Sequence, residues 1–223
     1  MALTDEAILR IKEMILGGQL KPGDRLPSEA ALADELGLSR NSLREAVRAL
    51  SLMNVLDVRH GDGTYVTSLD PNVLLDALTF VVDFHRDDSV LEFLRVRRIL
   101  EPAAASMAAL RMGDGEIDVL RKIVNSSFPD SRPEELLSLD IEFHRHIGLG
   151  SGNSVLASLL EGLSAPTNRA RIWRGRTQSG AQERTVLEHR AILDAIAAHE
   201  PDLAHSAMVV HVAGVENWLR LAQ

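Results

Sequence analysis

The sequence predicts a mainly α protein with two domains: an N-terminal winged helix-turn-helix and an all-α antiparallel helical bundle. Hydrophobic residues make up 45% of the 223 residues but aromatic residues only 4%, a balance that suits packed helices better than sheets. Residues 1–69 combine short helical patterns with a hairpin pattern, and residues 75–223 show helical periodicity broken by polar loops. Residues 70–74 are then a linker.

The N-terminal domain contains three predicted helices. An amphipathic run over residues 4–16 ends at a pair of glycines. Ser28 is a suitable N-cap for a short helix over residues 29–36, and Ser39 is a suitable N-cap for a helix that runs to about Met53. Because a tight turn containing glycine separates the second helix from the third, the pattern is that of a helix-turn-helix.

The third predicted helix carries Arg40, Arg44 and Arg48 on a face away from its apolar stripe. The chain as a whole is acidic, with a net charge of −8, and therefore lacks the overall basic balance of a non-specific nucleic-acid binder. Any contact with DNA must come from local placement of basic side chains. The alternative is that these arginines only solvate a helix face.

A predicted hairpin follows the third helix. Residues 55–58 and 64–67 have strand character, His60 to Gly63 form the tip, and Asn54 suits the left-handed conformation that ends a helix. A hairpin that directly follows a recognition helix is a wing. The wing and the helix caps favour DNA binding over simple solvation of the arginines.

Two segments of this domain, "LKPGDRLPSEAALADELGLSRNSLREAVRAL" and "VRHGDGTYV", resemble the DNA-binding domain of the GntR family of bacterial transcription regulators. The resemblance implies contacts of the third helix with operator DNA and of the wing tip with the minor groove. One departure is Ala30, where many members have Arg, and a DNA contact from that position is then absent. The implied DNA-binding residues are Arg25, Ser39, Arg40, Asn41, Ser42, Arg44, Arg48, His60 and Gly61.

The second domain reads as successive helices, and Pro102 is expected to kink or divide one of them. The predicted helices cover residues 72–84, 88–111, 114–125, 133–150, 153–174, 180–199 and 201–221.

Helical spacing points one carboxylate and three imidazoles into the bundle: Asp140 with His144, His189, and His211. Unpaired polar groups in a core are costly, and one divalent cation would satisfy all four. An Asp and three His suit zinc, nickel, manganese or iron and leave coordination positions open. An alternative for His211 is a hydrogen bond to an anion without a metal. The chain has no Cys, so thiolate sites and disulfides are excluded.

Three further segments, "RRILEPAAASMAAL", "DIEFHRHIGLGSGN" and "EHRAILDAIAAHEPDLAHSAMVVHV", resemble the FCD effector domain of the FadR-type GntR subfamily. The four inward residues match its metal ligands one by one, and the resemblance implies a small carboxylate effector bound against the metal. Arg97 lies near the inward edge of its helix and matches the family's pocket arginine, four residues before Glu101. An i,i+4 salt bridge between Arg97 and Glu101 is the competing interpretation.

We therefore expect a ligand-responsive, DNA-binding transcription regulator that acts as a homodimeric repressor without enzymatic activity. A metal-dependent hydrolase with an accessory DNA-binding domain is the alternative, because a His-rich site with open positions activates water. It is weakened by the lack of an evident general base or of an H-E-x-x-H motif. The absence of a signal-peptide pattern and of a long apolar run predicts a cytoplasmic location without a membrane partner.

Overall fold

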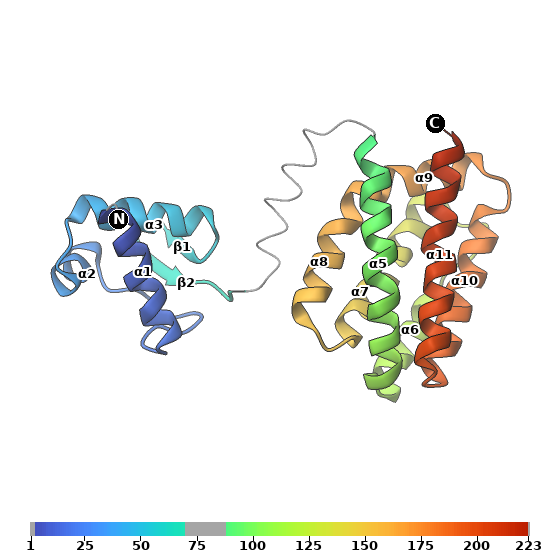
Figure 1. Cartoon of the computed structure of the whole chain (residues 1–223), viewed down its shortest axis with the longest axis horizontal. Helices are drawn as coiled ribbons and strands as arrows, with labels where there is room; N and C mark the ends of the chain where they lie inside the picture. The colour runs from blue at the N-terminus through green and yellow to red at the C-terminus, as the bar shows by residue number, and fades with distance from the viewer. Residues whose placement is uncertain (1–2, 70–87, 223) are drawn as a thin grey trace. The chain divides into compact units, whose positions relative to one another are not determined.

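The computed structural model describes residues 3–69 and 88–222, which belong to two compact units, Met1–Leu74 and Leu75–Gln223 (Figure 1). The predicted linker 70–74 and the predicted helix 72–84 lie outside the described residues. Each unit is described by itself. No described helix is both long enough and apolar enough to cross a membrane.

The first unit is a winged helix-turn-helix, as predicted. Its second and third helices begin where the sequence expects, because the Ser28 hydroxyl accepts a hydrogen bond from the Ala31 amide and the Ser39 hydroxyl accepts one from the Ser42 amide. The core between the helices includes Ala7 and Ile11 of the first helix, both completely buried. The elements are α1 (Leu3–Leu16), α2 (Glu29–Leu36), α3 (Arg40–Leu52), β1 (Leu56–Arg59) and β2 (Gly63–Val66).

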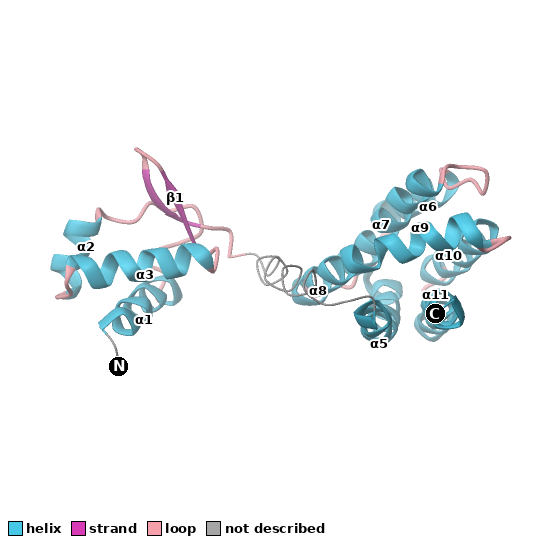
Figure 2. Ribbon diagram, turned by 90° about the horizontal axis from the view of Figure 1, so that it is seen from above, coloured by secondary structure: helices cyan, strands magenta, loops and turns pink. Residues whose placement is uncertain are grey.

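Strands β1 and β2 pair antiparallel, with Leu56 opposite Val66 (Figure 2). The observed strands are offset by a single residue from the predicted ranges 55–58 and 64–67. Asn54 has a φ of 54°, the left-handed conformation expected at the end of the third helix. The wing therefore starts immediately after α3.

The second unit is all-helical, which confirms the predicted fold class (Figures 1 and 2). Helix α5 packs along α11 and also contacts α7 and α10, so segments from both ends of the domain lie side by side. The described elements are α5 (Asp88–Arg111), α6 (Asp114–Asn125), α7 (Pro133–Gly150), α8 (Ser154–Ser164), the 3-10 turn η1 (Ala165–Thr167), α9 (Asn168–Thr177), α10 (Ala181–Ala197) and α11 (Pro201–Ala222).

One prediction about helix continuity was wrong, and of the two alternatives given for Pro102 the division of the helix is excluded. The predicted helix 153–174 is interrupted by η1, whose Pro166 lacks the amide hydrogen that a continuous α-helix needs. Conversely, Pro102 does not divide α5, which runs unbroken past it. Ala104 and Ala105, in the turn after Pro102, are completely buried, and their tight packing offsets the one hydrogen bond that proline removes.

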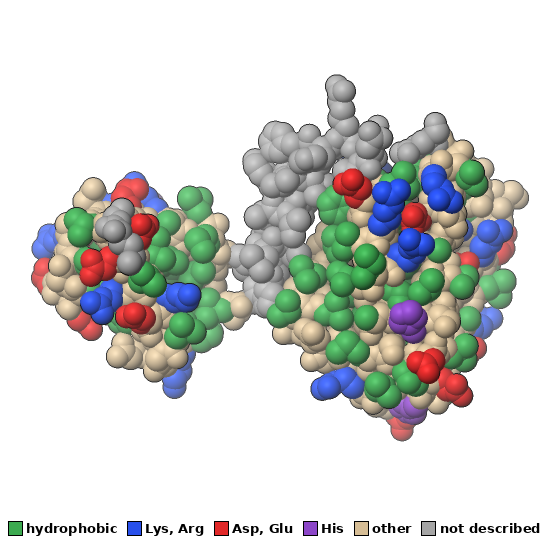
Figure 3. Space-filling model, in the orientation of Figure 1, with side chains coloured by type: hydrophobic (Ala, Val, Ile, Leu, Met, Phe, Trp, Pro, Cys, Tyr) green, Lys and Arg blue, Asp and Glu red, His purple; other side chains and the backbone are tan. Residues whose placement is uncertain are grey.

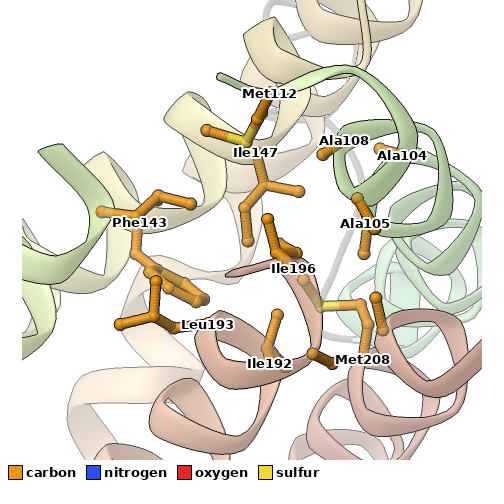
Figure 4. Packing of buried hydrophobic residues seen from close by; sticks show 14 of the residues in the cluster. Ala104, Ala105, Ala108, Met112, Phe143, Ile147, Ile192, Leu193, Ile196 and Met208 are labelled. Carbon is orange, nitrogen blue, oxygen red and sulfur yellow. The ribbon is translucent and has the colours of Figure 1, made fainter. Parts of the chain in front are cut away.

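The core of this unit forms where α5, α7, α10 and α11 meet (Figure 4). Small side chains of α5, such as Ala104 and Ala108, face larger ones, such as Ile192, Ile196 and Met208. Small opposite large residues let the helices approach closely without voids. This packing fixes the helices that carry the polar cluster described next.

Candidate metal centre and nucleic-acid interface

The structure brings together the four residues predicted as metal ligands. Asp140 and His144 lie one turn apart on α7, His189 comes from α10 and His211 from α11. One candidate donor atom from each of the four lies within 4.8 Å of the others, and all four residues are buried, with at most 7% of their surface exposed. The cluster therefore has the size of a coordination sphere.

The donor atoms face one another at short range. His189 Nε2 lies 3.2 Å from Asp140 Oδ1, and His144 Nε2 lies 3.2 Å from His211 Nε2. The ring of Phe143 stacks on His189, with 4.2 Å between the centroids and 20° between the planes. The imidazoles thus sit on an apolar base that keeps water from one side of the cluster.

Two glutamates hold the outer nitrogens of two imidazoles. Glu101 Oε2 lies 2.6 Å from His144 Nδ1, and Glu188 Oε2 lies 2.9 Å from His211 Nδ1. A carboxylate at Nδ1 keeps the proton there and leaves the Nε2 lone pair directed into the cluster, an arrangement usual around metal-bound histidines. This role as a partner of a ligand imidazole was not predicted from the sequence for either glutamate.

Asp140 is oriented in a similar way. Its Oδ1 faces the imidazoles, while Oδ2 accepts a hydrogen bond from Arg171 Nη1. The other amino group of Arg171 donates to Ser164 Oγ (2.7 Å) and Asn168 Oδ1 (2.6 Å), so three contacts fix the guanidinium. Burial alone would raise the pKa of Asp140, but Arg171 and the imidazoles outweigh it and hold that pKa well below its usual range.

The protonation of the imidazoles depends on their different surroundings. Burial lowers the pKa of His189 to about 4 and also lowers the pKa of His211. Burial opposes charge on His144 as well, but the carboxylates of Glu101 and Asp140 outweigh it and raise its pKa. The His189 and His211 rings are therefore neutral at pH 7, as metal ligation requires.

The residues fit a divalent cation on their own chemistry. His189 Nε2 is buried and has no hydrogen-bond partner among the described residues, although it faces the cluster. A cation would use this lone pair together with the carboxylate oxygen and the other two imidazoles. The predicted ligand residues thus converge on one position that suits an ion such as Zn²⁺, and such an ion would displace the proton that the carboxylates favour on His144.

Arg97 is buried, with 3% of its surface exposed, and pairs with Glu101 as the competing interpretation expected. Its Nη1 also donates to Thr167 Oγ1 at 2.8 Å. Because Glu101 in turn contacts His144, Arg97 is connected to the cluster through that carboxylate. It is absent from the lining of the pocket that adjoins Asp140 and His211.

That pocket opens beside Asp140 and His211, between α7, α9, α10 and α11. Its empty volume is about 460 Å³, part of which is open to solvent. Apolar side chains form much of the wall, and Arg171 and Arg174 supply its positive charge. A small anion in this space would lie next to the cluster.

In the first unit, most of the predicted DNA-binding residues lie on the surface. The predicted residues that are exposed are Arg25, Ser39, Arg40, Asn41, Arg44, Arg48, His60 and Gly61. Ser42 differs, since it is buried and its hydroxyl lies 2.8 Å from that of Ser39. Ser42 therefore contributes to the start of α3.

The basic side chains of this face have acidic neighbours. Arg44 Nε lies 3.3 Å from Glu29 Oε2, and Arg48 Nη1 lies 2.9 Å from Glu45 Oε1. Both pairs are exposed and therefore weak, so phosphates can displace the carboxylates. Arg25 donates to the Asp62 carbonyl and in this way fastens the wing tip to the loop before α2.

Comparison with known proteins agrees with this architecture. Residues 3–66 match the bacterial regulatory proteins of the gntR family, and residues 92–214 match the FCD domain. The chain belongs to the GntR family. The resemblance drawn from the sequence motifs is therefore confirmed, and the chain is a DNA-binding transcription regulator rather than an enzyme.

Several relatives align over nearly the whole chain. The HTH-type transcriptional regulator LutR of Bacillus subtilis is 32% identical and covers 92% of this chain and 96% of its own length. The galactonate operon transcriptional repressor of Escherichia coli is 28% identical, covering 94% and 93%. The solved structure of Streptococcus agalactiae GntR is 28% identical, with a TM-score of 0.73 over 96% of this chain and 99% of its own.

Proposed function

We propose that the FCD domain of this regulator binds one divalent metal ion through Asp140, His144, His189 and His211. Zinc is the ion that we propose first. Nickel, manganese and iron suit the same donors. The observation that carries the proposal is the convergence of four buried donors within 4.8 Å, with glutamates behind two of the imidazoles. Since ligands from α7, α10 and α11 meet at the ion, metal binding links three helices of the bundle.

We further propose that a small carboxylate is the effector and that it binds beside the metal. The pocket next to Asp140 and His211 supports this, because it adjoins the proposed ligands and Arg171 and Arg174 give it positive charge. The names of two Escherichia coli relatives refer to hydroxy acids. One is a putative L-lactate dehydrogenase operon regulatory protein, and the other is the galactonate operon transcriptional repressor. A small hydroxy acid is the class that these names favour.

Arg97 is a candidate effector ligand in this proposal. To bind an anion, its guanidinium would exchange Glu101 or Thr167 for the effector carboxylate. The competing role is to hold Glu101 against His144. Arg97→Gln distinguishes the two, since loss of the effector response with normal metal content supports effector binding, and loss of metal supports the structural role.

We propose that the regulator acts as a homodimeric repressor in the cytoplasm. Two recognition helices are needed to read two half-sites, and a symmetric dimer supplies them. Exposed apolar side chains of α5 and α11, among them Ile99 (70% exposed) and Val210 (62%), are candidates for the contact between copies, and Figure 3 shows apolar side chains gathered on the visible face of this domain. The effector releases DNA if it prefers a dimer geometry that does not fit the operator.

The proposed function is tested by measuring the melting temperature of the full chain with zinc or with a chelator, and with or without L-lactate. Zinc should raise the melting temperature, and L-lactate should raise it further only in the zinc form. A melting temperature unaffected by zinc would contradict the metal site. A zinc effect without any response to L-lactate, D-galactonate, acetate or L-malate would contradict the carboxylate effector alone.

A further inference from the structure

The two arginines of the pocket differ in how their hydrogen-bonding capacity is used. Both amino groups of Arg171 donate hydrogen bonds, to Asp140, Ser164 and Asn168, and only its Nε is buried without a partner among the described residues. Arg174 uses only Nε in a recorded hydrogen bond, which it donates to Gln178 Oε1 at 2.7 Å. Its Nη2 is buried without a hydrogen-bond partner among the described residues, although the residue as a whole is only 3% exposed.

An unpaired charged donor in a buried position is unusual, because it has lost its water without gaining another partner. Arg174 also lines the pocket beside the proposed metal ligands Asp140 and His211. A guanidinium in such a place is suited to an oxyanion, with which it forms charge-assisted hydrogen bonds. The free donor of Arg174 therefore indicates a bound group rather than a packing role.

Glu188 is the internal alternative. Its charge favours the ionised form of Arg174, but its Oε2 already accepts a hydrogen bond from His211 Nδ1. Gly214 leaves room beside both groups, since a Cβ there would lie 3.7 Å from Arg174 Nη2 and 3.8 Å from Glu188 Oε1. Glu188 balances part of the charge of Arg174 and leaves its hydrogen-bonding capacity open.

We infer that Arg174 is a second anion-binding group of the effector pocket and that the effector is a short dianion, such as a dicarboxylate. This rests on the proposed function: one acid group lies against the metal ion, and the second binds Arg174. A monocarboxylate would neutralise only one of the two positive centres. Arg174 and the proposed metal ligands Asp140 and His211 line the same pocket, so a short ligand with two acid groups suits both centres.

L-Malate and L-lactate form a matched pair of probes, because they share the 2-hydroxy acid group and malate adds one carboxylate. Their dissociation constants are measured by titration calorimetry on the zinc-loaded full chain. We expect the dissociation constant of malate to be at least about tenfold lower than that of lactate. Arg174→Gln should abolish this preference, because it weakens malate binding much more than lactate binding, and Arg174→Lys, which keeps the charge, should retain part of it.

Arg169→Gln is the control, since Arg169 lies on the same helix α9 but is exposed. It should keep the malate preference of the wild type. Equal binding of malate and lactate by the wild type, or a preference that survives Arg174→Gln, would overturn the inference and leave the carboxylate effector in place. Failure of both acids to bind a chain that does bind zinc would instead count against the carboxylate effector itself.

Discussion

The recognition face of α3 and the His-Asp cluster of the bundle both depend on charged side chains, but they use them in opposite ways. Arg44 and Arg48 are exposed and held only by solvent-accessible carboxylates. Asp140 and His189 are buried, and each is fixed by neighbours from other elements. Exposed groups are free to exchange partners for DNA, whereas buried groups keep a fixed geometry for an ion.

This contrast predicts where substitutions act. Changes on the α3 face should alter DNA binding and leave folding stability nearly unchanged, since exposed ion pairs contribute little. Changes in the cluster should alter metal binding and stability together, because binding to the folded state alone adds to stability.

The largest effect is expected for His189→Ala. The change removes a ligand and a buried ring, so the zinc-dependent part of the stability disappears, about 2.7 kcal/mol when free zinc is at 100 times the dissociation constant. Chemical unfolding with zinc and with chelator measures this part directly. His205→Ala is the control, because His205 lies exposed on α11 and should keep the full response.

The next effect is expected for Glu188→Gln. Gln keeps the size of the side chain but loses the charge that polarises His211 through Nδ1. Zinc affinity should fall about 10–100-fold, the usual cost of altering such an outer partner. A competition assay with a chromogenic chelator gives the affinity. Glu183→Gln, an exposed change on the same helix, should have no effect, and an equal loss there would contradict the assignment.

A smaller effect is expected for Arg44→Ala on the recognition helix. Loss of one base or phosphate contact should weaken binding to operator DNA by about 1–3 kcal/mol. Fluorescence anisotropy at fixed salt measures it, and the melting temperature should stay near that of the wild type. Unchanged affinity at the same salt concentration would remove Arg44 from the DNA interface.

The smallest effect is expected for Glu29→Gln. The carboxylate of Glu29 competes with DNA for Arg44 at a distance of 3.3 Å, so its neutralisation should strengthen operator binding by up to about 1 kcal/mol. Glu13→Gln on α1 offers a comparison, since it removes the same charge away from Arg44. Weaker binding after Glu29→Gln would indicate that the carboxylate positions the arginine for DNA.

The two regions also differ in how much the sequence could predict. The cap residues Ser28 and Ser39 and the turn residue Asn54 are local signals, and they located the helices and the wing to within a residue. The inward direction of the His and Asp side chains followed from helical spacing. That spacing predicts which face a residue occupies, but it gives no distances between helices.

The partners of the cluster could not be predicted in the same way. Arg171 reaches Asp140 from 31 residues away, and Glu188 reaches His211 from 23 residues away. Such pairs depend on how α9 and α10 pack, which no short-range pattern specifies. The break at η1 had a local signal, Pro166, but the apolar periodicity on both sides of it favoured a single helix.

Anomalous diffraction at the zinc edge, from crystals of the full chain grown with zinc, tests the central claim most directly. The account predicts one peak per chain at about 2.0–2.2 Å from a nitrogen of each of the three imidazoles and from an oxygen of Asp140. A zinc-soaked crystal with no peak at these side chains, or with a peak bound elsewhere, would contradict it.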